Sequence, residues 1–202
     1  MAELSIHIVT GGPIDVNTYV VSQPERDDCV LIDPGAEISD IESAIGGKRV
    51  AAVILTHGHF DHILYAAHFL DQGARLYANE EDVPMLSSSM LNLSGMIGRK
   101  IRLPKPDVLL RDGETVEAAG ISFLVLHTPG HTKGSVCLLS GKDLFSGDTL
   151  FYASYGRTDL PGGDEEEMEK SLRRLFLLDG DISVYPGHGP ATRIAWERER
   201  RV

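Results

Sequence analysis

Seven side chains of the types that bind metal ions recur along this chain. Four of them fall within six consecutive residues: His57, His59, Asp61 and His62. Three more lie downstream: His131, Asp148 and His188. Imidazole and carboxylate groups without thiolate suit zinc, and iron and manganese also accept them. The set therefore predicts a hydrolase built around two divalent metal ions, with zinc as the first expectation.

The first four candidate ligands follow an apolar run, residues 50–55, that is typical of a buried strand. Gly58 permits a looped backbone that turns His57 and His59 toward one ion. Residues 61–70 have the composition of a helix, and Asp61 in its first turn suits the helix dipole. We therefore expect a strand end, a loop and a helix start to direct four ligands to one point.

The downstream ligands occupy positions of the same kind. Each follows a β-rich run and stands beside a glycine: His131 after residues 121–126, Asp148 after 143–145 and His188 after 182–185. Four strand ends are therefore expected to meet at one rim. The other histidines fit this pattern less well. His7 and His68 are interpreted as non-ligands, while His127 either supports a ligand or turn through a hydrogen bond or is simply structural.

Composition limits the function classes. The chain has 202 residues, of which 42% are hydrophobic and 24% charged, which suits one globular domain over residues 1–202. No apolar stretch approaches the roughly 20 residues of a membrane span, and the N-terminus does not resemble a secretion signal, so a cytoplasmic location is expected. The net charge of −11 disfavours nucleic acid as a partner. Cys29 and Cys137 are expected to be buried small hydrophobes.

The order of elements predicts two β-sheets packed together and covered by helices. Further strands are expected at residues 5–9, 18–21, 29–32, 75–78 and 135–139, and further helices at 37–45 and 164–178. Residues 86–106 show no clear period. This segment either forms an adaptable lid containing Met90 and Met96 or is a surface connection. Its basic side chains are either a binding strip or a solvated loop: Arg99, Lys100, Arg102 and Lys105.

The segment His57-Gly58-His59-Phe60-Asp61-His62 resembles the H-x-H-x-D-H signature of the metallo-β-lactamase superfamily. The motifs at 128–132, 146–151 and 185–189 look like those of the glyoxalase II group of hydroxyacylglutathione hydrolases, and the resemblance spans about residues 17–192. It implies an α+β fold, an αββα four-layer sandwich of two mixed sheets. It also implies a ligand set for each ion: His57, His59 and His131 on one, Asp61, His62 and His188 on the other, with Asp148 bridging.

This resemblance implies hydrolysis of a small-molecule thioester by a hydroxide that bridges the two metals. Asp61 would also orient the hydroxide as a catalytic residue. Neither cysteine falls at a ligand position, which argues against the β-lactam-hydrolysing subclasses that use one. Full-length glyoxalase II enzymes carry a helical C-terminal domain, whereas only residues 189–202 follow the last ligand here, so the chain resembles the compact form.

In the compact form, substrate contacts must come from the main domain. Residues 155–164 are the candidate segment, in which Arg157 either binds a substrate carboxylate or is tied to Asp159 or Asp164. The same segment resembles persulfide dioxygenases, which bind a single iron, and this is the alternative function. A lactonase or a metal-binding module without catalysis also stays open, whereas the acidic balance counts against a nuclease.

Overall fold

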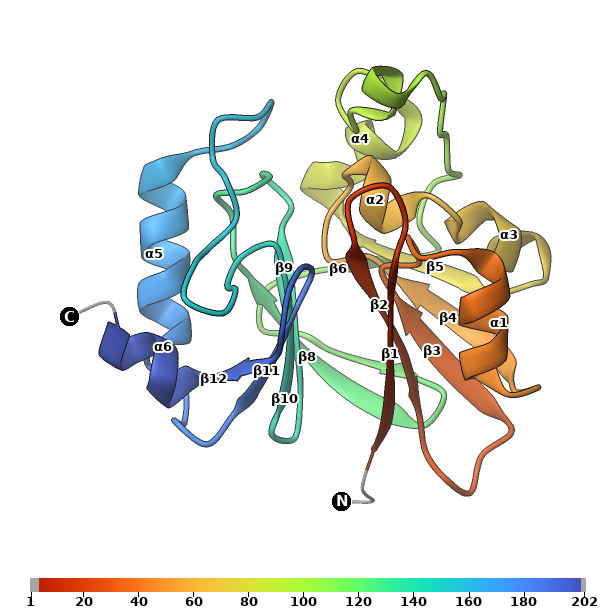
Figure 1. Cartoon of the computed structure of the whole chain (residues 1–202), viewed down its shortest axis with the longest axis horizontal. Coiled ribbons are helices and arrows are strands. Elements are labelled where there is room, and N and C mark those ends of the chain that lie inside the picture. The colour runs from red at the N-terminus through yellow and green to blue at the C-terminus, as the bar shows by residue number, and fades with distance from the viewer. Residues whose placement is uncertain (1–3, 201–202) are drawn as a thin grey trace.

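The computed structural model describes residues 4–200, in which two six-stranded mixed sheets pack face to face (Figure 1). The first sheet contains β1 Ser5–Gly11, β2 Val16–Ser22, β3 Asp28–Ile32, β4 Arg49–Ile54, β5 Arg75–Asn79 and β6 Val108–Leu110, in that order. The second contains β7 Thr115–Ala118, β8 Ile121–His127, β9 Val136–Ser140, β10 Asp143–Gly147, β11 Ser183–Pro186 and β12 Thr192–Arg193.

Both sheets mix parallel and antiparallel pairs. In the first, β1, β2 and β3 form an antiparallel meander, and β3 to β6 run parallel to their neighbours. In the second, β10 and β11 pair in parallel and the other pairs are antiparallel. The parallel pairs matter for function, because parallel strands bring their carboxyl ends to the same edge of a sheet.

Helices cover the outer face of each sheet and complete four layers. On the first sheet lie α1 Ile38–Ile45, α2 Phe60–Ile63, α3 Ala66–Asp71 and α4 Val83–Ser87. On the second lie α5 Glu165–Leu175 and α6 Ile194–Arg200. Figure 1 shows α5 and α6 on one side, α1 and α3 on the other, and both sheets between them. This arrangement confirms the predicted α+β sandwich.

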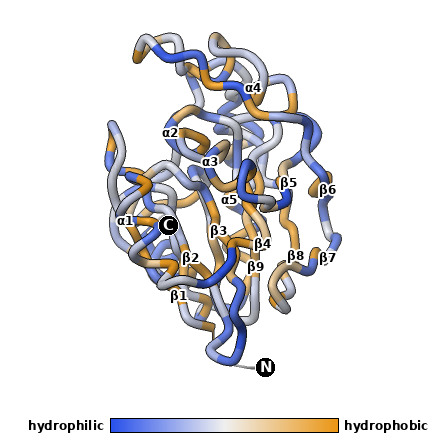
Figure 2. The backbone as a smooth tube through the Cα atoms, turned by 90° about the vertical axis from the view of Figure 1, so that its right-hand side faces the viewer, coloured by the Kyte–Doolittle hydropathy of each residue, from blue (hydrophilic) through white to orange (hydrophobic). Residues whose placement is uncertain are grey.

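Alternation along the strands produces three apolar layers. In β3, Leu31 packs outward against the helices of the first sheet, whereas Val30 and Ile32 pack inward between the sheets. Phe123 and Phe145 meet them from the second sheet, and a third layer joins that sheet to α5. Figure 2 shows the result as hydrophobic segments along the central strands and hydrophilic segments in the loops.

Helix α5 shows how local chemistry sets a boundary. The side chain of Asp164 accepts a hydrogen bond from the Glu167 N–H and so caps the first turn. Met168, Leu172 and Leu175 recur at spacings of four and three residues and are all buried. The helix ends at Leu175, three residues earlier than its sequence predicted.

The helix predicted over residues 61–70 is wrong as one element, since the structure contains α2 and α3 with a break at Leu64 and Tyr65. At Tyr65 the backbone leaves the helical region (φ −116°, ψ 10°). Its N–H donates to the Pro34 carbonyl at 2.9 Å instead of to a carbonyl one turn back. The turn after β3 therefore interrupts the helix. Strands β6 and β12 and helices α4 and α6 were not predicted.

Residues 86–106 are anchored to the rest of the protein through Asn92. Asn92 is fully buried, and its side-chain amide donates to the Met85 and Ile101 carbonyls at 2.9 and 3.1 Å. The backbone carbonyl of Asn92 accepts the Phe60 N–H at 2.8 Å, which joins the segment to α2.

None of the helices among residues 4–200 has the length and apolar character needed to cross a membrane.

Candidate metal centre

Four strand ends bring the seven predicted ligand side chains to one rim of the sandwich. His57, His59, Asp61 and His62 follow β4, and the others follow β8, β10 and β11. Six of the seven are buried, and the side chain of His188 is 23% exposed. The convergence of strand ends therefore occurs as the sequence analysis expects.

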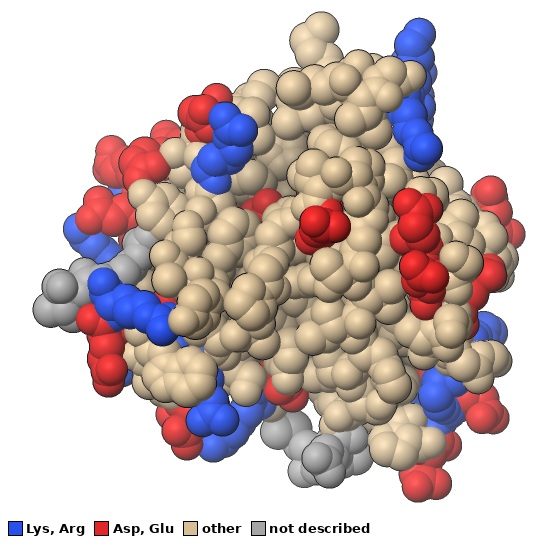
Figure 3. Space-filling model, in the orientation of Figure 1, with Lys and Arg blue, Asp and Glu red and all other residues tan. Residues whose placement is uncertain are grey.

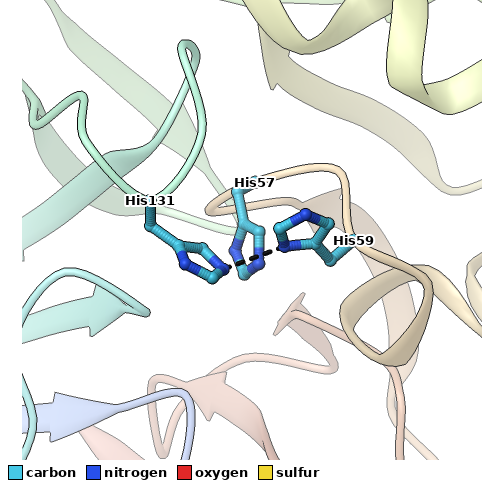
Figure 4. A group of neighbouring side chains, drawn as sticks. All are labelled: His57, His59 and His131. Carbon is cyan, nitrogen blue, oxygen red and sulfur yellow. Dashed lines mark hydrogen bonds between the residues drawn. The ribbon is translucent and has the colours of Figure 1, made fainter. Parts of the chain in front are cut away.

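His57, His59 and His131 form the first group. Their ring centroids are 4.6 to 4.9 Å apart, and their candidate ligand atoms all lie within 4.8 Å of one another. The Nδ1 atom of His59 is 2.9 Å from Nε2 of His131 (Figure 4). Two nitrogens about 2.0–2.1 Å from a tetrahedral ion would be roughly 3.3 Å apart. The first group is therefore close to the spacing of one metal site.

Asp61, His62 and His188 form the second group, and Asp148 lies between the two. One Asp61 oxygen is 3.2 Å from Nε2 of both His62 and His188. Asp148 Oδ1 is 3.3 Å from His62 Nε2 in the second group, and Oδ2 lies between the groups, 3.4 Å from His131 Nε2 and 3.7 Å from His188 Nε2. A carboxylate in this position can contact two ions at once.

Hydrogen bonds on the outer side of the rings direct their free nitrogens inward. The Nδ1 atom of His57 is hydrogen-bonded to Thr56 Oγ1 at 3.1 Å, and that of His62 to Asp33 Oδ2 at 2.9 Å. The Nδ1 atom of His131 is hydrogen-bonded to the Arg157 carbonyl at 2.7 Å, and that of His188 to the Asp15 carbonyl at 3.2 Å. Each partner accepts a hydrogen bond, which places a proton on Nδ1 and turns Nε2 toward the centre, where its lone pair would bind a metal.

Buried atoms without hydrogen-bond partners provide the test of fit. Four such atoms occur among the described residues, and all belong to this cluster: Nε2 of His57, His59 and His62, and Oδ1 of Asp148. An orphaned buried polar atom is costly, and native structures rarely contain one without a reason. His57 Nε2, His62 Nε2 and Asp148 Oδ1 are donors that a divalent ion would satisfy, whereas His59 faces His131 with its other ring nitrogen, Nδ1. The residues present therefore fit a metal centre.

Asp33 is a supporting residue that the sequence analysis missed. Its carboxylate accepts the Thr56 N–H at 2.8 Å, the Thr56 hydroxyl at 2.6 Å and His62 Nδ1 at 2.9 Å. It also lies within metal-binding distance of His57 and His62, but these three bonds already occupy its oxygens. Its position at the end of β3, parallel to β4, is the sequence signal that could have identified it.

Asp82 is a second supporting residue that was missed. It is 1% exposed and accepts three hydrogen bonds: from the Gly58 N–H at 2.9 Å, the Gly134 N–H at 2.8 Å and the Thr132 hydroxyl at 2.8 Å. One carboxylate thus joins the loop after β4 to the loop that contains His131. Nothing in the local pattern around residue 82 indicates this contact.

Two glycines are required by close approach. Gly58 lies in a loop between β4 and α2, as predicted, and its backbone is not left-handed; a Cβ there would lie 2.8 Å from the Cβ of Met85. A Cβ at Gly187 would lie 2.2 Å from Asp148 Oδ1 and 2.7 Å from a ring carbon of His62. Gly187 therefore leaves space for the cluster itself.

Burial and mutual charge shift the ionisation of the cluster. Burial, reinforced by the neighbouring imidazoles, lowers the pKa of His57 well below its usual value and that of His59 to about 3. Burial alone would lower the pKa of His62, but the carboxylates of Asp61, Asp148 and Asp33 outweigh it and raise that pKa well above 6.5. Burial opposes ionisation of Asp61, yet His62 and His188 lower its pKa.

The remaining candidates are resolved individually. His127 matches the interpretation that it supports a turn through a hydrogen bond, because its Nε2 is 2.8 Å from the Lys133 carbonyl in the loop that contains His131. His68 pairs with Glu42 at 2.9 Å, and His7 is exposed on β1. Both predictions of non-ligands are consistent with these positions.

Both cysteines are fully buried, as predicted, and burial raises the pKa of each thiol to about 11. Neither thiolate is available at neutral pH.

A cavity of about 660 Å³ opens above the cluster. Its floor contains His59, Asp61, His131, Asp148 and His188, so both groups face it. Arg157 also lines it, while Nε and Nη2 of that side chain pair with Asp159 at 2.6 and 2.8 Å. The basic side chains at 99, 100, 102 and 105 are not among its lining residues.

Sequence and structure comparisons relate the chain to known proteins. The family model of the Metallo-beta-lactamase superfamily matches residues 11–188 of this chain. The crystal structure of BLEG-1 B3 metallo-beta-lactamase superposes with a TM-score of 0.90 at 34% identity, covering 96% of this chain and 97% of that one. The crystal structure of TTHA1623 in a di-iron-bound form superposes with a TM-score of 0.80 at 37% identity, covering 95% of this chain and 96% of that one. The hydroxyacylglutathione hydrolase GloC of Haemophilus influenzae is 31% identical over 96% of this chain and 95% of GloC.

Proposed function

The chain belongs to the metallo-beta-lactamase superfamily, and from this premise we propose that it is a metal-dependent thioester hydrolase of the glyoxalase II type. Metal-dependent hydrolysis agrees with the histidine and aspartate groups at the rim. The narrower assignment to thioesters draws on the sequence motifs at 128–132, 146–151 and 185–189. The similarity to GloC, a hydroxyacylglutathione hydrolase, supports it.

The observation that carries this proposal is the position of Asp148 between two groups of ligands. Each group offers three donors, and the Asp148 carboxylate lies within 3.3 to 3.7 Å of ring nitrogens from both groups. We assign His57, His59 and His131 to one ion and the second group, Asp61, His62 and His188, to the other. Zinc suits these donors, and the di-iron form of TTHA1623 makes iron the alternative.

Bound divalent ions supply Lewis-acid chemistry, which lowers the pKa of water and polarises an acyl carbonyl. The chain's own residues position the reactants. Asp61 lies on the cavity floor and accepts a hydrogen bond from the attacking water, which orients that water. Asp33 keeps the His62 ring in place. A thiolate leaves readily, so no further side chain is needed as a general acid.

Arg157 is proposed as the residue that meets an anionic part of the substrate. It lines the cavity, and guanidinium groups bind carboxylates in a bidentate manner. Its present partner Asp159 is largely exposed, so exchanging that partner for a substrate carboxylate would cost little.

The test combines elemental analysis with a substrate panel. Purified protein is expected to contain about two metal ions per chain. It should hydrolyse at least one thioester, and Asp148→Ala should lose both metal and activity. The panel also contains a lactone, a β-lactam and glutathione persulfide. One iron per chain with oxygen uptake on the persulfide, or turnover of the lactone or β-lactam alone, would overturn the thioesterase proposal.

A further inference from the structure

The cavity above the metal-ligand cluster has apolar walls. Seven of its lining residues are large and apolar: Ile14, Phe60, Leu93, Met96, Ile97, Phe151 and Leu160. They come from the start of α2 and from three separate loops, namely the β1–β2 turn, the segment after α4 and the loop after Asp148. The cluster forms the floor of the same cavity, so a substrate held over it must touch these side chains.

Three of the wall side chains are exposed at the mouth. Ile14 is 53% exposed, Met96 79% and Ile97 36%. Exposed apolar groups gathered around a cavity mark a surface that a ligand covers. Leu93 holds a left-handed backbone (φ 65°, ψ 5°) that is unfavourable for leucine, and such strain tends to occur at functional sites. Met96 adds a flexible thioether that adapts to different apolar groups.

Cations are scarce on the same walls. Among the described residues that line this cavity, Arg157 is the one lysine or arginine, and its guanidinium already has Asp159 as a partner. In the view of Figure 3, Lys and Arg lie mainly toward the margins, and the centre is mostly uncharged apart from a few acidic side chains. A ligand with several negative charges would leave at least one of them unpaired beside apolar side chains, which is unfavourable.

We propose that this cavity selects substrates with an apolar acyl group on a carrier that bears no more than one charged group. This inference rests on the proposed thioester hydrolysis and deepens it. The acyl chain lies against the walls at Leu93, Met96 and Leu160, and a single carboxylate on the carrier can reach Arg157. Glutathione brings two carboxylates and one ammonium group. One carboxylate can meet Arg157, whereas the other carboxylate and the ammonium would lie beside apolar side chains, so glutathione thioesters are poor substrates.

The test uses the metal-loaded full chain and thioesters of N-acetylcysteamine, an uncharged carrier. From acetyl to butyryl to hexanoyl, kcat/KM should rise about 4-fold per methylene, because each buried methylene contributes about 0.8 kcal/mol. Hexanoyl-N-acetylcysteamine should exceed S-lactoylglutathione by at least about 10-fold. A flat dependence on chain length, or preference for S-lactoylglutathione, overturns the inference while leaving thioester hydrolysis intact.

The chain offers a matched pair of variants. Met90 and Met96 are both 79% exposed, but only Met96 lines the cavity. Met96→Ser should lower kcat/KM for the hexanoyl thioester by about 5-fold, a partial loss of one methionine contact, and leave the acetyl thioester unchanged. Met90→Ser should change neither. Equal effects of the two substitutions contradict the role of Met96.

A binding measurement separates this inference from the proposed function. S-hexyl-N-acetylcysteamine is a thioether that cannot be hydrolysed, and calorimetry should detect its binding with a negative heat-capacity change. Binding that Met96→Ser weakens, together with no hydrolysis of any thioester, would retain the apolar site and reject the thioesterase. Absence of binding would reject the apolar site whatever the enzyme hydrolyses.

Discussion

The buried carboxylate of Asp82 joins two ligand-bearing loops, so its removal should weaken both the fold and the metal centre. In Asp82→Asn, the remaining oxygen can replace Oδ2 and keep the bonds from Gly58 and Thr132. The new amide then faces the Gly134 N–H, donor against donor. Loss of one hydrogen bond to a charged group should lower the free energy of unfolding by about 1.5–3 kcal/mol.

Asp82→Ala should be more severe. It leaves the Gly58 and Gly134 N–H groups buried without partners, whereas the Thr132 hydroxyl retains Ser135 Oγ at 2.8 Å. Two orphaned donors at about 1–3 kcal/mol each give a loss of about 2–6 kcal/mol. Since partners that orient ligands affect metal binding, zinc affinity should fall about 10- to 100-fold in either variant.

Urea denaturation of metal-free protein gives the stability, and competition with a chromogenic chelator gives the zinc affinity. Asp107→Asn is the control, because the Asp107 carboxylate accepts the Leu76 N–H at 2.8 Å and lies outside the metal-binding groups. It should change zinc affinity less than about twofold, since it does not orient a ligand. If Asp82→Asn also leaves zinc affinity at the control's value, the coupling of the two loops through Asp82 is refuted.

Three further predictions concern the centre and the surface. Gly187→Ala should abolish metal binding, because the new Cβ would lie 2.2 Å from Asp148 Oδ1. Gly11→Ala is the control and should keep its metal, because its new Cβ would have its nearest contact at 3.4 Å. The metal content of both variants after dialysis tests this. A chelator should lower Tm by about 10 °C and added zinc should restore it, as expected for tight ligands of the folded state; an unchanged Tm would argue against bound metal. Burial would raise the pKa of Asp112, but the ion pair with Arg174 lowers it overall. The pair therefore stabilises the fold above the unfolded carboxyl pKa of about 4, and this stabilisation is lost as pH falls through the lower pKa of the folded state. Arg174→Ala should therefore cost up to about 1 kcal/mol at pH 7 and less in acid, and a loss that grows in acid would contradict this.

Local patterns were sufficient to predict most strands and the kinds of ligand present. Residues 29–32 and 50–55 are apolar on both faces because each strand lies between two hydrophobic layers, so β3 and β4 could be predicted without a structure. The helix over residues 61–70 was wrong because the Pro34 carbonyl binds the Tyr65 N–H, and this contact joins positions that are far apart in the chain.

The sequence by itself determined which residues could bind metal and that each follows a strand, since ligand chemistry and strand periodicity are local properties. Only the tertiary structure decided how they group. His59 and His131 are 72 residues apart, yet their ring nitrogens are 2.9 Å apart because β4 and β8 end at the same rim. The roles of Asp33 and Asp82, and the apolar cavity walls, also depend on packing between distant segments, which no local pattern encodes.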